Sequence, residues 1–275
     1  MDPYSKLVKK PLTFKRITGL DLHEFHTIIA KLRPIFQRKY LKKKKIAGRP
    51  YAVESIESQL VCLLIYYRVY TTHFFLGLIF NVDPTTICRT IRRIEPLLAK
   101  VMRIKKERKM PERELETLII DCTEQPIRRP QKRQKKFYSG KKRRHTIKTE
   151  IVTNQRGKIK QISKPYPGSV HDIKIRKKQK PLPPHAQILV DSGYQGLQNE
   201  HEHVRLPIKK TKKNPLTRKS RHSNRQLSRE RIIIENKFAQ MKIFQILAQT
   251  YRNSLASYGV KTAIIAGIVN MKNGF

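Results

Sequence analysis

The sequence predicts an α/β (α+β) protein in which an all-α region comes first and a mixed sheet with flanking helices follows. Up to about residue 115, apolar residues recur at the spacing of one face of a helix. From about residue 116 onward, short apolar runs alternate with turn-forming residues, which is typical of strands. A chain of 275 residues is long enough for two such cores, so we expect domains at 1–115 and 116–275.

The first region contains an apolar stretch at residues 60–80 that is long enough to span a bilayer. Arg68 and His73 lie near its middle, where a charged side chain would be costly in lipid. We therefore expect two short buried helices and no membrane segment. Before this stretch, Asp21 is placed to cap a helix that runs to Arg38.

A further helix is expected after Asp83, because aspartate caps helices and Pro84 suits the first helical position. Ile87, Ile91 and Ile94 share one face of this helix, and Pro96 should end or kink it. The other faces carry Thr85, Thr86, Arg89, Thr90, Arg92 and Arg93. This pattern predicts a helix-turn-helix whose second helix offers Thr85, Thr86, Arg89 and Arg93 to a DNA major groove. An ordinary amphipathic helix with a solvated basic face is the alternative.

The second region begins with the apolar run 118–120, a buried strand that ends in Asp121. Two strands at 145–155 and 157–164 follow, joined by a turn, and His171–Asp172 opens a short helix. The apolar run 187–190 is another strand, which ends in Asp191. A strand at 204–209, a basic loop at 209–225 and helices at 228–249 and 256–271 complete the chain. This order matches a ribonuclease-H-like fold.

The charge of the chain predicts a polyanionic partner. Lysine and arginine total 61 against 20 acidic residues, a formal net charge of +41. Neutralised phosphates release condensed counterions, so we expect nucleic acid, with basic loops at 132–144 and 209–225 on the backbone. A generally basic, solvated surface is the alternative. The three cysteines are far apart, which indicates a reducing compartment and neither a disulfide framework nor a zinc ribbon.

Two strand-end aspartates, Asp121 and Asp191, suggest a metal site. If the strands are neighbours, the carboxylates converge and raise each other's pKa unless a cation lies between them. Two divalent ions about 3.5–4 Å apart can clamp the oxygens of a displacement at phosphorus. For a third acid, Glu235 shares a helix face with Arg231 and Lys242. Alternatively, the aspartates cap turns and Arg231 forms a surface salt bridge with Glu235.

Other candidates are weaker. Asp172 follows a glycine turn, and we expect it to cap the next helix or to anchor a loop. The run His201-Glu202-His203 lacks further ligands at a suitable spacing, which favours a solvated loop. Glu230 is the second choice for the third acid, because it leaves the helix in a different direction from Glu235.

Five motifs carry a resemblance to a known family. They are IIDCTEQPIRRP at 119–130, KKFYSGKKRRHTIKTEIV at 135–152, PGSVHDIKI at 167–175, LVDSGYQG at 189–196 and R-x3-E-x6-K at 231–242. The chain resembles the DDE transposases of bacterial insertion sequences, in the group related to Harbinger-type transposases. The resemblance implies that Asp121, Asp191 and Glu235 are the catalytic, metal-binding triad. It also implies that Arg231 and Lys242 position Glu235 or hold DNA phosphates.

The resemblance further implies binding of element ends and cleavage and strand transfer with two divalent ions, Mg²⁺ or Mn²⁺. The partner is double-stranded DNA, both element ends and target, contacted also by Lys141, Lys142 and Arg143. We expect a homodimer or a higher assembly on DNA and no small-molecule cofactor. The expected location is the bacterial cytoplasm at the nucleoid, or the nucleus in a eukaryotic host. The alternatives are a domesticated DNA-binding protein without cleavage activity and a stand-alone nuclease or resolvase.

Two positions depart from the family pattern. Cys122 follows Asp121 where glycine is common, and its larger side chain could crowd the site. Ser228 replaces a common tyrosine three residues before Arg231, which affects the expected contacts of that helix with DNA.

Overall fold

Two compact units make up the protein in the computed structural model, which describes residues 2–41, 50–104, 117–211 and 215–275. The first unit contains the residues up to Arg103 together with Met241–Gln249 and Val260–Gly274. The second contains Ile104–Gln240 and Thr250–Gly259. Two C-terminal segments thus belong to the unit of the N-terminal helices, and the domain division at about residue 115 stays a prediction.

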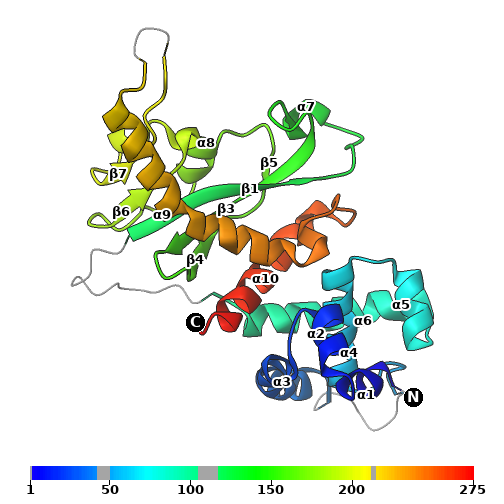
Figure 1. Cartoon of the computed structure of the whole chain (residues 1–275). Coiled ribbons are helices and arrows are strands. Elements are labelled where there is room, and N and C mark those ends of the chain that lie inside the picture. The colour runs from blue at the N-terminus through cyan, green and yellow to red at the C-terminus, as the bar shows by residue number, and fades with distance from the viewer. Residues whose placement is uncertain (1, 42–49, 105–116, 212–214) are drawn as a thin grey trace. The chain divides into compact units, whose positions relative to one another are not determined.

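The described N-terminal part of the first unit is helical, as predicted (Figure 1). Its helices are α1 (Pro3–Val8), α2 (Pro11–Thr18), α3 (Leu22–Phe36), α4 (Ile56–Val69), α5 (His73–Phe80) and α6 (Pro84–Val101). Asp21 caps α3 as expected, because its carboxylate accepts from the Glu24 N–H while Glu24 accepts from the Asp21 N–H, both at 2.9 Å. The α-helix ends at Phe36 rather than Arg38, and Gln37–Leu41 winds as a π-helix. The run of four lysines that follows in the sequence, at residues 42–45, lies outside the described residues.

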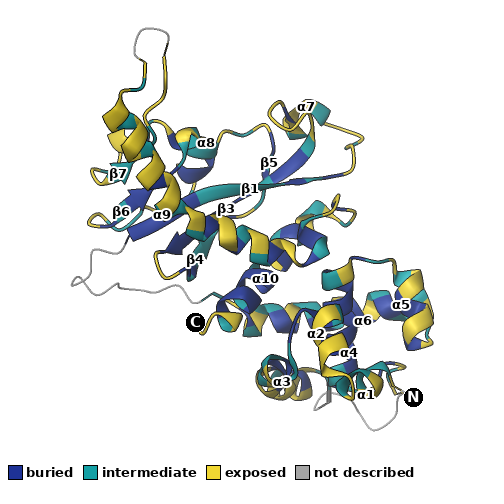
Figure 2. Ribbon diagram, viewed as in Figure 1, coloured by how far each residue is buried: buried dark blue, intermediate teal, exposed yellow. Residues whose placement is uncertain are grey.

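The apolar stretch at 60–80 forms two helices, α4 and α5, as predicted. Within the described residues, no helix has the length and hydropathy needed to cross a membrane. The prediction that both helices are buried is wrong for α5, where Phe74 and Leu78 are 75% and 81% exposed (Figure 2). This two-turn helix is apolar on all sides and packs on one of them only, through Leu76, Gly77 and Phe80.

Helix α6 follows the predicted pattern at its start. The Asp83 carboxylate accepts from the Thr85 N–H at 2.7 Å, and Pro84 occupies the first turn. Its buried residues include Ile87, Ile91 and Ile94, as predicted, but also Thr90, which was expected on an outer face. Pro96 does not end the helix, which continues to Val101 with the exposed proline inside it.

The second unit is built on a mixed sheet with helices, the ribonuclease-H-like arrangement expected from the sequence (Figure 1). The strands are β1 (Thr117–Pro126), β2 (Tyr138–Ser139), β3 (Arg144–Asn154), β4 (Ile159–Ile162), β5 (Tyr166–Pro167), β6 (Gln187–Leu189) and β7 (Val204–Arg205). Their order is β2-β3-β1-β6-β7, and β4 and β5 also pair with β3. Strand β1 is antiparallel to β3 and parallel to β6.

The remaining helices are α7 (Gln134–Phe137), α8 (Asp172–Arg176), α9 (Arg218–Lys242) and α10 (Tyr258–Lys272). Short 3-10 turns lie at Ser192–Tyr194, Leu197–Asn199, Gln245–Leu247 and Leu255–Ser257. The predicted loop at 132–144 contains α7 and β2. The long helix begins at Arg218 rather than at 228, so part of the predicted loop at 209–225 is helical, and it ends at Lys242 rather than at 249.

The core of the second unit has one cluster on each face of the sheet. Ile119 and Leu189 pack with Leu227 and Ile234 of α9. Their strand neighbours Leu118, Ile120, Ile188 and Val190 pack on the other face with Tyr194. Because side chains alternate along a strand, Asp121 lies on the same face as Ile119, the face that α9 covers.

Candidate active site

Asp121 in β1 and Asp191, two residues beyond the end of the parallel strand β6, lie at the same level of the sheet. Ile119 of β1 is in register with Leu189 of β6, and each aspartate follows two residues later. The prediction that Asp121 ends its strand is wrong, since β1 continues to Pro126. It does so because β3 pairs with β1 through Pro126, whereas β6 stops at Leu189. Asp121 therefore lies where β1 has lost its parallel neighbour.

Asp191 begins a tight turn, and the carboxylate of Asp172 lies next to this turn. Oδ1 of Asp191 accepts from the N–H of Gly193 at 2.8 Å. A Cβ atom at Gly193 would lie 2.7 Å from Oδ2 of Asp172 and 3.0 Å from Oδ1 of Asp191. A side chain at this position would displace the two carboxylates from their present positions.

The Asp121 carboxylate is 19% exposed and has two partners. Its Oδ2 accepts from Nη2 of Arg231 at 3.1 Å, and its Oδ1 accepts from the N–H of Cys122 at 2.7 Å. Burial raises the pKa of Asp121 to about 6, against the lowering effect of Arg231; the charges of Asp191 and Asp172 raise the pKa as well. Desolvation and neighbouring negative charge both favour the protonated acid, so the site disfavours a further anion without a counter-cation.

Asp172 is part of this acidic cluster, which sequence reasoning weighted too low. It does not cap α8 but is its first residue, and its Oδ1 accepts from Nζ of Lys148 at 3.1 Å. The same ammonium donates to the Val170 carbonyl at 3.1 Å. The available signal was an acid directly after a glycine turn, but only the fold of that loop shows that it faces Asp191.

Glu235 is not brought to the aspartates. It is exposed on α9 and, within the described residues, takes part in no hydrogen bond or ion pair. The alternative salt bridge from Arg231 to Glu235 is not formed either, because Arg231 turns to Asp121. Glu230 is held by Arg205 in a two-point ion pair of 2.7 and 3.1 Å.

The donor chemistry of the site fits a divalent cation in part. Asp121, Asp191 and Asp172 supply the hard oxygen ligands that Mg²⁺ takes, and their mutual repulsion would be relieved by a cation. In the described part of the chain, however, no three acidic, histidine or cysteine side chains form a ready-made metal site. This includes the run at 201–203, where His201 contacts the Pro183 carbonyl at 2.9 Å.

A sealed polar network lies on the opposite face of the same strands. Glu150, in register with Cys122, pairs with Arg176 at 2.8 Å, and the two side chains are 1% and 3% exposed. Burial raises the pKa of Glu150 to about 7 despite the lowering effect of Arg176. The Cys122 sulfur lies 3.3 Å from the Tyr194 hydroxyl, within the core of that face. The concern that Cys122 crowds the site is therefore wrong, because its side chain points away from Asp121.

The candidate DNA contacts of α6 differ in availability. Arg89 and Thr85 are exposed, and Thr86 is half-buried. The Arg93 guanidinium stacks over the Tyr51 ring at 3.7 Å and donates to Oε1 of Gln59 at 3.3 Å. Arg89 is thus the arginine of this set that the structure leaves on the surface, while Arg93 serves packing within its own unit.

The remaining candidate DNA contacts are on the surface. Lys141, Lys142 and Arg143 are exposed in the turn between β2 and β3, where Arg143 has a φ of 50°. Lys242 is exposed at the last residue of α9, in a segment grouped with the helical unit.

Two family models and a named relative are similar to this chain. Residues 120–270 match the model of the DDE superfamily endonucleases, and residues 52–104 match the model of the helix-turn-helix of DDE superfamily endonucleases. The second match covers α4, α5 and α6. The chain is 35% identical over 266 residues to a protein named probable transposase for insertion sequence element IS702, from Microchaete diplosiphon. That alignment covers 94% of this chain and 93% of the relative. No solved structure gives a significant match.

The catalytic family model spans more than half of the chain, and the relative is similar along nearly all of it. The two family models cover the helical region at 52–104 and the sheet region at 120–270, in this order. The chain belongs to the DDE superfamily of endonucleases, among the transposases of bacterial insertion sequences.

Proposed function

We propose that this transposase binds the ends of its element and cuts and rejoins DNA strands by metal-dependent phosphoryl transfer. The observation that carries the proposal is the common level of Asp121 in β1 and Asp191 just beyond the end of the parallel strand β6. Membership of the superfamily supports dependence on a divalent metal in general. We further propose that the metal is Mg²⁺ or Mn²⁺ and that two ions bind.

We assign Asp121, Asp191 and Glu235 as the residues that would hold the metal. Bound there, the cations would neutralise charge on the attacking and leaving oxygens of the phosphodiester. Asp121 provides a carboxylate on β1, and Asp191 provides one in the turn that follows β6. Glu235, one turn beyond Arg231 on α9, provides the third ligand when its exposed side chain turns to the aspartates.

Arg231 has a positioning role in this proposal. Its guanidinium is 12% exposed and holds the Asp121 carboxylate in place. The Lys148 ammonium does the same for Asp172. Among the described residues, the two positively charged side chains Arg231 and Lys148 thus face the three carboxylates of Asp121, Asp172 and Asp191. The site keeps a net negative charge, which suits a metal ion. The exposed basic residues of each unit, Arg89 in the first and Lys141–Arg143 in the second, would hold the DNA in a homodimer or a higher assembly.

The test uses conservative changes of the acids. Asp121→Asn, Asp191→Asn and Glu235→Gln keep the side-chain shape and remove a metal-binding charge. Each variant should lose cleavage and strand transfer together, by about 10²–10³-fold or more, because both steps need the same charge stabilisation. Cleavage of a duplex carrying the inverted repeat that flanks the gene, in Mg²⁺ and in Mn²⁺, measures this loss.

Glu230→Gln is the matched control on the same helix, because Arg205 already occupies its carboxylate. This variant should cut like the parent. If Glu230→Gln is inactive while Glu235→Gln cuts normally, the third ligand is assigned wrongly. If the parent binds the duplex but cuts it with neither metal, the chain is a DNA-binding protein without cleavage activity. Cleavage without strand transfer would identify a nuclease or resolvase.

A further inference from the structure

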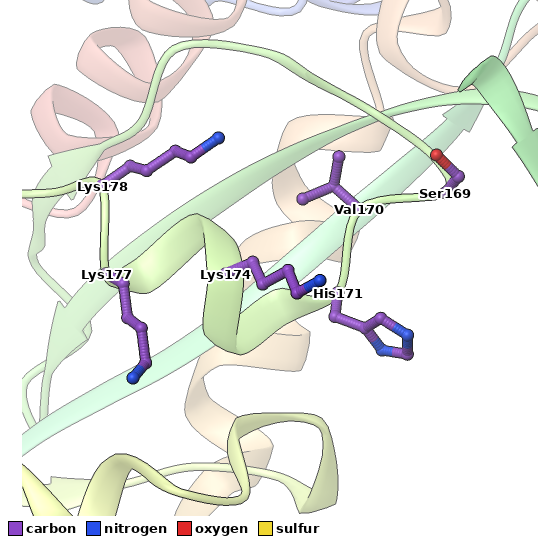
Figure 3. A pocket seen from close by; sticks show the side chains of 6 residues that line it. All are labelled: Ser169, Val170, His171, Lys174, Lys177 and Lys178. Carbon is purple, nitrogen blue, oxygen red and sulfur yellow. The ribbon is translucent and has the colours of Figure 1, made fainter.

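A basic pocket lies beside the acidic site in the second unit. Its volume is about 440 Å³, and Figure 3 shows the side chains that line it. They are Ser169, Val170, His171, Lys174, Lys177 and Lys178. Three of these six residues are lysines and none is acidic, so the pocket suits an anion.

The pocket and the acidic site share one loop. His171 lines the pocket, and the next residue, Asp172, places its carboxylate against Gly193 beside Asp191. Lys148 links the two sides, because its ammonium contacts both the Asp172 carboxylate and the Val170 carbonyl at 3.1 Å. An anion in the pocket would therefore lie close to a phosphate held at the aspartates.

The same pocket adjoins the basic segment at 132–144. The hydroxyl of Ser169 donates to the carbonyl of Lys136 at 2.6 Å, which fixes the edge of the pocket against that segment. On the other side, the ammonium groups of Lys178 and Lys164 lie 5.8 and 5.7 Å from the centre of the Tyr166 ring. Positive charge thus continues beyond the pocket in both directions.

The three lysines are not equivalent. Lys177 forms an ion pair with Glu200, and Figure 3 shows it leaving the chain in a different direction from Lys174, which extends toward His171. Lys174 and Lys178 are exposed, and within the described residues neither has a carboxylate partner. These two lysines are the ones available to an external anion.

We propose that this pocket binds backbone phosphates of the DNA strand whose reacting phosphate lies at Asp121 and Asp191. The inference rests on the proposed function and extends it to Lys174 and Lys178. Successive nucleotides of a duplex strand advance by about 3.4 Å, so a strand held at the aspartates reaches the pocket within a few nucleotides. The lysines anchor that strand next to the reacting phosphate.

The test is the salt dependence of binding by the double variant Lys174→Gln/Lys178→Gln. Fluorescence anisotropy with the inverted-repeat duplex, in EDTA without metal, gives the slope of log K against log salt between about 50 and 200 mM. Each phosphate contact contributes a slope of about −0.9 on duplex DNA. The slope of the variant should therefore be shallower than that of the parent by about 1.8.

Arg156→Gln/Lys158→Gln is the matched control, since it removes two charges from the β3–β4 turn of the same unit. Its slope should change by less than half as much. Phosphate ethylation interference gives an independent readout: with the parent, ethylation of phosphates beside the cleavage position should block binding, and with the pocket variant it should no longer do so.

Equal slopes for the pocket variant and the parent, or an equal change in the pocket and control variants, would overturn the inference. So would an unchanged interference pattern. These readouts need no cleavage, so they separate the two proposals. If the parent protein does not cut DNA but the pocket variant still shows the shallower slope, the proposed chemistry is refuted. The pocket then remains a DNA-binding site.

Discussion

Two carboxylate–guanidinium pairs lie on opposite faces of β1 and β3, and they differ in their contact with water. On the α9 face, Asp121 and Arg231 are 19% and 12% exposed, beside two further carboxylates. On the α8 face, Glu150 and Arg176 are 1% and 3% exposed and lie in the core. The same chemistry is therefore open to solvent on one face and sealed on the other.

The difference follows from the strand pairing. Asp121 lies beyond the end of β6, where no strand among the described residues pairs with that edge of β1. Glu150 lies in the middle of β3, which has β1 on one side and β4 and β5 on the other. An open pair can exchange its partner for another cation, whereas a sealed pair holds the fold. The three predictions below test this division of roles.

The largest effect is expected at the sealed pair. Glu150→Gln leaves the Arg176 guanidinium buried without a counter-charge, which typically costs about 3–5 kcal/mol in the free energy of unfolding. Urea denaturation measures the cost. As a control, Glu150→Leu/Arg176→Met removes both charges and should recover much of the loss. A cost below about 1 kcal/mol for Glu150→Gln would show that this pair is not structural.

A smaller effect is expected at the open pair. Arg231 lowers the pKa of Asp121, so Arg231→Gln should raise it further above about 6. The folded protein then binds this proton more tightly than the unfolded chain, whose ordinary value is 3.8. Stability from this group is therefore lost as pH rises from about 4 through the folded pKa, and the loss should be larger in the variant.

Carboxyl-carbon NMR titration of the metal-free protein measures the Asp121 pKa in both forms. Mg²⁺ should lower the apparent pKa in the parent, because the cation competes with the proton. An Asp121 pKa that is the same with and without Arg231 would contradict the role assigned to this arginine. Arg205→Gln serves as a control, since Arg205 pairs with Glu230 and is not among the groups that shift the Asp121 pKa.

The smallest effect is expected at a third pair of the same type. Glu230 and Arg205 are 26% and 32% exposed at the surface of the unit. Exposed pairs contribute about 0–1 kcal/mol, so Glu230→Gln should lower the free energy of unfolding by no more than that. Thermal unfolding at two salt concentrations gives the value. If Glu230→Gln lowered the free energy of unfolding as much as Glu150→Gln, the burial of an ion pair would not determine its contribution to stability.

The sequence by itself determined the class of fold and the helix-turn-helix, and it indicated Asp121 and Asp191 as candidate site residues. Local patterns carry these features: the capping by Asp83, the isoleucine face of α6, and apolar runs that end in an acid. Membership of the family followed from motifs in the right order, and the family models agree with it. The place of Glu235 in the triad rests on motif spacing alone and stays a prediction.

Only the tertiary structure decided what these residues face. The strand pairing carried β1 past Asp121, and the alternation of side chains packed Cys122 against the core of the opposite face. Packing placed the Arg93 guanidinium on Tyr51 and left Phe74 of α5 exposed. The carboxylates of Asp172 and Asp191 can both lie next to residue 193 because glycine has no side chain there. Each of these outcomes depends on contacts between segments far apart in the chain, and local patterns do not record such contacts.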